Sequence, residues 1–359
     1  MAHELTIREN GKVEMAYVGD TPWHGLGNVL TPGAAIEEWI YAAGMDWRIQ
    51  RGRVRYAVSR DSDATDYREF DDRVVLFRGD SKAPLGIVSD GFQIVQPRET
   101  IEFFRDLVGN AGGQLETAGT LFGGRKFWAM ARFGADTVVA DRRDTMKLNL
   151  LLATACDGSM ATEGSWISTR VVCNNTLQIG RSETGSDAIR VKINHRTKFD
   201  ATTVKAELGI EKAQSVFART VSDMRKLAEL KLSPRNVVLA TAKLFNPDFR
   251  TLDDKAQNKV LNSKPVQTVG KLALDGTAIG AEHDGMAGTA YGWLNAVTEY
   301  VDHTGRARTA DARLDSAWFG KGADMKERAF AMAMAGAEDD ARAPGSAVDS
   351  VNAWLASHS

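Results

Sequence analysis

The sequence predicts an α+β fold in which a mostly antiparallel sheet packed with helices is followed by a helical region. Up to about residue 200, short runs of alternating apolar and polar residues are separated by turns rich in Gly, Pro and Asp, as is typical of strands. From about Ala201, apolar residues recur every three or four positions, which is the period of a helix. We therefore divide the chain into a strand-rich α+β core domain over 1–200 and a mainly helical region over 201–359.

The first predicted elements are a short helix and a hairpin. Pro32 and Gly44 bound an apolar pattern with helical spacing, and Pro commonly starts helices while Gly ends them. Two β-rich runs then follow at 47–59 and 67–78, separated by a polar, acidic segment. This order of runs and turn predicts a hairpin with a polar tip.

Pro97 predicts the start of a second helix over 97–109, whose apolar residues share one face. The adjacent glycines Gly123 and Gly124 predict a two-residue hairpin turn, because such turns demand positive φ angles. Further strands are predicted at 148–156, 166–173 and 188–195.

The helical region begins with a single long helix predicted over 203–230, which ends before Ser233-Pro234. Gly and Pro breaks separate the later helical patterns. These patterns predict helices at 234–245, 251–261, 286–301, 323–335 and 346–357.

Composition excludes several classes of protein. The chain has 359 residues, of which 43% are hydrophobic, and its 45 Lys and Arg nearly balance 47 Asp and Glu, so it is neither disordered nor low in complexity. Two cysteines are too few for a disulfide scaffold, and no run of about 18 uncharged apolar residues predicts a membrane span. We expect a soluble protein of the cytoplasm. Near-neutral charge means that any nucleic-acid binding depends on a local patch.

A basic strand is the strongest candidate for such a patch. Alternation places Arg190, Lys192, Asn194 and Arg196 on one face, with Lys198 just beyond. Side chains on alternate positions stand about 6.6 Å apart, so this row can follow the phosphates of an extended single strand. The alternative is a solvated sheet face. His195, on the apolar side, is interpreted as a structural histidine.

A second cationic row consists of Arg51, Arg53 and Arg55. These residues join the predicted DNA-binding set. The alternative is structural, because Glu69 and Asp71 on the neighbouring predicted strand can form cross-strand ion pairs with the row.

The glycine hairpin supplies an aromatic residue between two cations. Lys126, Trp128 and Arg132 share one face of the strand, which suits base stacking beside phosphate contacts. The alternative is that Trp128 belongs to the core. Arg170, on the predicted strand 166–173, completes the predicted DNA-binding set.

Catalytic and cofactor motifs are weak or missing in the sequence. Cys156 and Cys173 lie at the ends of apolar runs, and nothing in the sequence provides the third group that would orient His195 as a base. Phosphate-binding loops, dinucleotide fingerprints and metal-binding spacings do not occur. A nuclease would need clustered carboxylates, and the pairs at 71–72 and 339–340 are interpreted as solvated tips. We therefore predict no enzyme, no cofactor and no metal.

Several distinctive segments occur in order along most of the chain. They are 17–27 (YVGDTPWHGLG), 156–159 (CDGS), 170–177 (RVVCNNTL), 193–197 (INHRT), 295–303 (NAVTEYVDH) and 318–320 (WFG). These segments resemble the phage- and plasmid-associated proteins that contain domain of unknown function 932. The resemblance implies a mobile-element protein of the bacterial cytoplasm, and the sheet-then-helix layout suggests similarity to single-strand annealing proteins of recombination.

These observations predict a non-catalytic protein that binds single-stranded DNA and promotes strand annealing or homologous recombination. The resemblance to annealing proteins implies a homo-oligomer, as a ring or filament, and the helix predicted at 203–230 is a candidate packing surface between protomers or within one chain. The alternative is a host-interaction or anti-defence module without nucleic-acid binding, whose loop Thr21-Pro22-Trp23-His24 binds a bacterial partner through Trp23.

Overall fold

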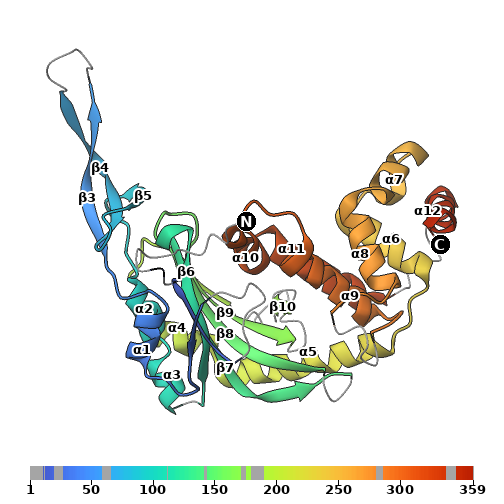
Figure 1. Cartoon of the computed structure of the whole chain (residues 1–359), viewed down its shortest axis with the longest axis horizontal. Coiled ribbons are helices and arrows are strands. Elements are labelled where there is room, and N and C mark those ends of the chain that lie inside the picture. The colour runs from blue at the N-terminus through green and yellow to red at the C-terminus, as the bar shows by residue number, and fades with distance from the viewer. Residues whose placement is uncertain are drawn as a thin grey trace. The chain divides into compact units, whose positions relative to one another are not determined.

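The computed structural model of the chain has an α+β fold, with strands in the N-terminal half and mainly helices in the C-terminal part (Figure 1). This confirms the predicted fold class. The residues that the structure describes are 11, 13–19, 27–58, 66–110, 112–140, 144–170, 175–178, 190–279, 286–336 and 345–358.

The larger sheet has eight strands in the order β10-β9-β8-β7-β6-β1-β2, and β11 also pairs with β9. Strands β1 and β2 are parallel, whereas β6 is antiparallel to both β1 and β7. The strands of this sheet are β1 (Met15–Val18), β2 (Asn28–Leu30), β6 (Gln114–Leu121), β7 (Lys126–Val138), β8 (Thr145–Ala155), β9 (Thr162–Arg170), β10 (Asn175–Gln178) and β11 (Arg190–Ile193).

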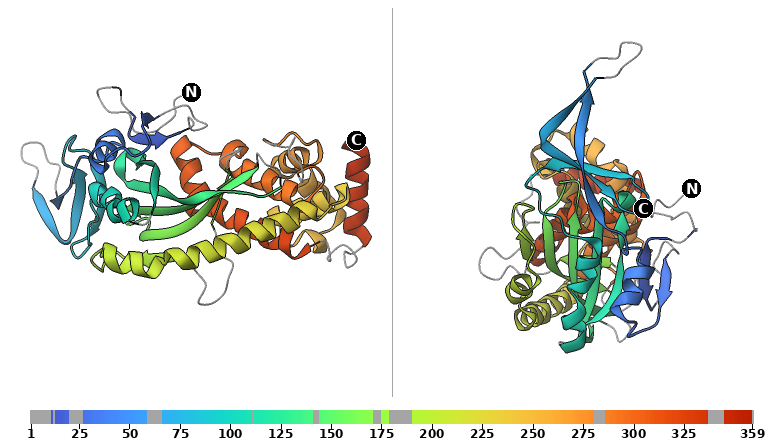
Figure 2. Two further views of the ribbon diagram at one scale, coloured as in Figure 1. Left: turned by 90° about the horizontal axis from the view of Figure 1, so that it is seen from below. Right: turned by 90° about the vertical axis from the view of Figure 1, so that its left-hand side faces the viewer.

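The smaller sheet contains the first predicted hairpin. It has the order β3-β4-β5, with β3 (Ile49–Ala57), β4 (Tyr67–Arg78) and β5 (Pro84–Ser89) all antiparallel. β5 pairs only with the stretch from Arg73 to Phe77 of β4. The outer part of β3 and β4 therefore extends beyond β5 as a two-stranded ribbon (Figures 1 and 2).

The hairpin around Gly123 and Gly124 is confirmed, but its turn is longer than predicted. Leu121 pairs with Lys126, and a 3-10 turn, η1 (Phe122–Gly124), lies between β6 and β7. Both glycines have positive φ, of 71° and 93°. A Cβ at Gly124 would lie 2.6 Å from the Trp47 ring, so this position also lacks room for a side chain.

The predicted N-terminal helices form with changed limits. The first is α1 (Ile36–Ala42), which starts later than expected because the Ala35 amide donates to Glu38 Oε2 at 2.9 Å and caps the helix there. The second is divided into α2 (Pro97–Glu102) and α3 (Arg105–Asn110).

The single long helix predicted at 203–230 is wrong. The chain instead forms α4 (Ala201–Leu208) and α5 (Ile210–Glu229). Gly209, between them, has a φ of +48°, which interrupts the helical backbone.

The C-terminal helices match most of the predicted positions. Two of them, α8 and α10, were not predicted, although Pro265 at the start of α8 and the Thr309 cap of α10 are ordinary start signals. The elements are α6 (Pro234–Phe245), η2 (Phe249–Thr251), α7 (Asp254–Leu261), α8 (Lys264–Leu274), α9 (Ala290–Glu299), the π-helix η3 (Tyr300–Thr304), α10 (Ala310–Phe319), α11 (Lys321–Met334) and α12 (Gly345–His358).

The chain forms two compact units that each take several segments of the sequence. The first unit contains Met1–Gly134, Asn149–Trp166 and Ile189–Ile210, and the second contains Ala135–Leu148, Ile167–Ala188 and Glu211–Ser359. Within the described residues, no helix is both long and apolar enough to cross a bilayer.

Each unit has a buried apolar core. In the first, large aromatic side chains such as Trp39, Phe104 and Phe127 are fully buried. In the second, every residue of α9 is buried, and the Trp293 indole donates to the Thr241 hydroxyl at 2.9 Å.

Candidate nucleic-acid interface

The structure brings two of the predicted cationic segments together in the first unit. Arg51, at the base of β3, donates to the main-chain oxygens of Asp90, at 2.8 Å, and of Phe92. The Phe92 ring in turn stacks on the His195 imidazole, with centroids 4.2 Å apart. The row on β3 and the segment around His195 are therefore separated by one loop.

A turn held by His195 follows β11. The Gln93 amide donates to the His195 main-chain oxygen at 2.6 Å, and the ring nitrogens lie 2.9 Å from Gln93 O and 3.0 Å from Met160 O. These contacts confirm the structural role predicted for His195. They also fix the turn against the loop that Arg51 contacts.

The predicted row of donors on one strand face is wrong beyond Lys192. The strand ends at Ile193, and the Thr197 amide donates to Asn194 O at 2.9 Å, which makes 194–197 a turn. Lys192, Asn194, Arg196 and Lys198 are nevertheless all exposed, and Lys192 is 55% exposed. We name the segment 192–198 the cationic turn.

Arg190 is not part of this exposed set. Its guanidinium binds the carboxylate of Glu163, with Nη2 donating to Oε2 at 2.6 Å, and Glu163 is buried. Lys192 Nζ is farther from the same carboxylate, at 3.9 Å. The Glu163 charge is thus neutralised mainly by Arg190, and the charge of Lys192 remains at the surface.

On the hairpin, the structural alternative for Arg53 and Arg55 is confirmed. Arg53 Nη1 and Arg55 Nη2 each lie 2.8 Å from a different oxygen of Glu69. The hydrogen bonds from Arg55 and then Arg53 lower the pKa of the Glu69 carboxyl. One carboxylate is shared by two guanidinium groups, so the three side chains carry a net positive charge.

The same ribbon exposes aromatic rings that the sequence analysis did not single out. Tyr56, Tyr67 and Phe70 are 48%, 61% and 48% exposed. Tyr56 pairs directly opposite Arg68, and its ring lies edge-on to that of Phe70 with centroids 6.4 Å apart. Tyr56, Arg68 and Phe70 therefore share one face, which we name the aromatic ribbon.

Trp128 does not provide the predicted stacking surface. It is 1% exposed, because both faces of β7 are covered along most of the strand. Trp128 is therefore a core residue. Its predicted partners, Lys126 and Arg132, are half-buried. Arg132 donates to Gln114 Oε1 at 2.8 Å, and the Lys126 ammonium lies 5.9 Å from the Phe122 ring centroid.

Arg170 is also buried, so the structure contradicts its predicted contact with DNA. Its Nε donates to Asp144 Oδ1 at 2.6 Å, and both side chains lie in the interior of the second unit. A buried guanidinium that already binds a buried carboxylate cannot reach a phosphate without unfolding its surroundings.

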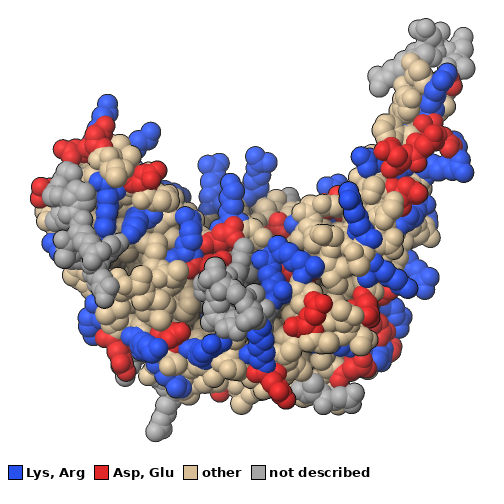
Figure 3. All heavy atoms as spheres, turned by 180° about the vertical axis from the view of Figure 1, so that it is seen from behind, with Lys and Arg blue, Asp and Glu red and all other residues tan. Residues whose placement is uncertain are grey.

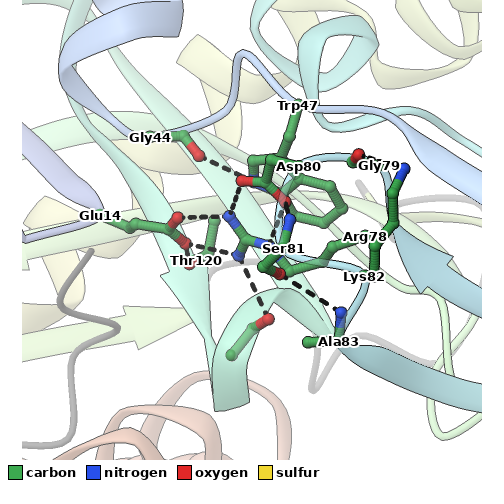
Figure 4. A network of polar contacts seen from close by, with 11 residues as sticks. Glu14, Gly44, Trp47, Arg78, Gly79, Asp80, Ser81, Lys82, Ala83 and Thr120 are labelled. Atoms are coloured by element: carbon green, nitrogen blue, oxygen red, sulfur yellow. Dashed lines mark hydrogen bonds and ion pairs between the residues drawn. The ribbon is translucent and has the colours of Figure 1, made fainter. Parts of the chain in front are cut away.

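The base of the hairpin is anchored by Arg78, the last residue of β4 (Figure 4). Its guanidinium lies 4.1 Å from the Trp47 ring centroid and binds the carboxylates of Glu14 and Asp80. It also donates to Gly123 O at 3.2 Å. The start of the ribbon is therefore fixed to β1 and to the η1 turn.

The cysteine considered as a nucleophile is buried. Burial raises the pKa of the Cys156 thiol to about 12, and Sγ donates to Arg125 O at 3.3 Å. Among the described residues, no group of three or more His, Cys, Asp or Glu side chains is arranged to hold a metal ion. Cys173, the Trp23 loop and the pair at 339–340 lie outside the described residues.

The chain was compared with known families, curated proteins and solved structures. The family described as a domain of unknown function (DUF932) matches residues 84–318, which is more than half of the chain. No curated protein and no solved structure matches the chain.

Proposed function

Since the chain belongs to the family defined by domain of unknown function 932, we propose that it is a non-catalytic single-stranded DNA-binding protein of a phage or plasmid. In this proposal it acts in the bacterial cytoplasm, as a homo-oligomer, and promotes strand annealing or homologous recombination. Such a role needs a surface that binds the backbone of one strand and leaves its bases accessible to a complement.

The observation that carries the proposal is the cationic turn. Lys192, Arg196 and Lys198 are exposed within seven residues, and the turn is held in place through His195. Arg51 lies next to it across the Asp90–Phe92 loop, with its guanidinium 3.9 Å from the Asp90 carboxylate. A fixed cluster of cations attracts phosphates locally even where the whole protein is close to neutral.

The structure also shows which substitutions can test this. Reversing the charge of Arg190 would place a second carboxylate beside the buried Glu163 and would destabilise the sheet. A loss of binding by that variant could then come either from unfolding or from a lost DNA contact. Arg196 and Lys198 are exposed, and their neutralisation leaves the described core unchanged.

The test measures the fluorescence anisotropy of a labelled dT15 oligonucleotide over a range of salt concentrations. We expect the double variant Arg196→Gln and Lys198→Gln to bind more weakly, with the slope of log affinity against log salt reduced in magnitude by about 1 to 2, because each phosphate contact on a single strand contributes about 0.7. The matched control neutralises Lys255 and Lys259, two exposed lysines of α7. Equal binding by both double variants would refute the role of the turn.

A second readout addresses annealing itself. We expect the wild-type protein to accelerate the pairing of two complementary labelled strands without a nucleotide cofactor, and the Arg196 and Lys198 double variant to do so less. If the protein binds neither strand at low salt, the function fails, and a protein partner becomes the better explanation of its exposed surfaces.

A further inference from the structure

We propose that the aromatic ribbon, formed by Tyr56, Arg68 and Phe70, is a stacking platform for unpaired nucleobases. This inference rests on the proposed function, because it assigns to the hairpin the base contacts of the strand whose phosphates bind the cationic turn. Trp128, the stacking residue that the sequence predicts, is buried and cannot take this role.

The geometry of the face suits planar ligands. Arg68 lies directly opposite Tyr56, and the Tyr56 and Phe70 rings meet edge to face. Arg68 is 66% exposed, and its contact with Asp66 is long, at 3.9 Å. A guanidinium plane beside two exposed rings offers stacking surfaces to bases of any sequence.

The ribbon lacks the coverage that normally stabilises such a surface. Within the described residues, the outer part of β4 pairs with β3 alone, because β5 ends its pairing at Arg73. A two-stranded ribbon is only marginally stable in water. A ligand that covers its exposed aromatic rings removes apolar surface from water, which lowers the free energy of the complex. A bulge between Arg53 and Arg55 separates the anchored base of the hairpin from this outer part. Such bulges often re-aim a strand beside a functional site.

The exposed rings and the Arg68 guanidinium favour a nucleic acid as the occupant, because each can stack on a base. Figure 3 shows Lys and Arg side chains beside Asp and Glu side chains along the ribbon. Glu69 is shared by Arg53 and Arg55, Arg68 lies 3.9 Å from Asp66, and Asp71 and Asp72 are also exposed on β4, so cations and carboxylates are mixed along the ribbon. Arg51, at the base of the same strand β3, lies beside the loop that holds the cationic turn. The base of the ribbon and the cationic turn therefore contact the same loop.

The experiment compares dT15 with an oligomer of the same length that has abasic residues in place of the bases. Stacking requires bases whereas phosphate contacts do not, so we expect the wild-type protein to bind dT15 more tightly than the abasic strand. The variant Tyr56→Ala with Phe70→Ala should lose about tenfold or more in affinity for dT15 and little for the abasic strand. The exchange of Tyr56→Phe with Phe70→Tyr keeps both rings and should retain tight binding.

Controls separate stacking from folding and from self-association. Tyr41→Ala removes an exposed ring of α1 in the same unit and should leave both affinities unchanged. Thermal unfolding should be similar for all variants, because the substituted side chains are exposed. Light scattering of each variant reports the oligomeric mass.

Two results would overturn the platform while leaving the cationic turn intact: equal wild-type affinity for dT15 and the abasic strand, or an unchanged preference for dT15 in the Ala double variant. A fall in mass without a change in dT15 affinity would also overturn it, since a second copy of the chain would then cover the ribbon. If the wild-type protein binds neither strand, the proposed function itself fails.

Discussion

The guanidinium of Arg78 and the carboxylate of Glu14 form a two-point buried ion pair, with Nη2 2.6 Å from Oε1 and Nη1 3.0 Å from Oε2 (Figure 4). Glu14 also accepts a hydrogen bond from the Thr120 hydroxyl at 2.6 Å. The two residues are 64 positions apart, so this pair fixes the base of the β3–β4 hairpin to the start of β1.

Replacing Arg78 should destabilise the protein strongly. Arg78→Met leaves the Glu14 charge buried without its cation, which typically costs about 3–5 kcal/mol. Urea unfolding followed by circular dichroism measures this. The control is Arg98→Met, whose exposed pair with Glu102 should be worth about 1 kcal/mol or less. A similar loss in both variants would contradict the anchoring role of Arg78.

Asp80 should make the stability dependent on pH in strong acid. The hydrogen bond from Arg78 lowers the pKa of the Asp80 carboxyl to about 2, from an ordinary value of 3.8. Because the folded pKa is depressed, the stabilisation is present above about pH 4 and is lost as the pH falls towards 2. We therefore expect the difference in unfolding midpoint between the wild type and Asp80→Asn to shrink between pH 5 and about pH 2. A difference that is constant across this range would show that the ionised carboxylate contributes nothing.

The buried pair of Lys326 and Asp302 should show strong coupling. Lys326 Nζ lies 2.7 Å from Asp302 Oδ1, and burial lowers the pKa of the lysine while Asp302 opposes this change. Lys326→Met alone removes the ammonium that donates to the buried Asp302 carboxylate and should cost about 3–5 kcal/mol. Combining it with Asp302→Asn should recover part of that loss. Additive losses in the double-mutant cycle would contradict the coupling.

Local patterns were sufficient to predict the elements with clear boundaries. The helix at 234–245 is α6 as predicted, because Pro234 follows a Ser cap and the apolar spacing is regular. The β3–β4 hairpin was predicted from alternation on both sides of a polar turn. Gly209 shows the limit of this approach: a single glycine within a continuous helical period either remains helical or adopts positive φ, and the sequence does not distinguish these.

The candidate site was predicted in part, because exposure depends on contacts that are distant in sequence. Alternation placed Trp128 and Arg190 on the cation-bearing faces of their strands. It did not show that β7 is covered on both sides or that Glu163 on β9 neutralises Arg190. The aromatic ribbon had a local signal. Its rings, Tyr56 and Phe70, flank a polar turn in a hairpin, and such rings have little core to enter at the end of a ribbon.

The most direct test of single-strand binding is the anisotropy of labelled dT15 and of a 15-base-pair duplex with the wild-type protein, at low and at physiological salt, with light scattering of the same samples. The account predicts tighter binding of the single strand, with an affinity that falls as salt rises. Equal affinity for the duplex, or no binding of either at low salt, would contradict it.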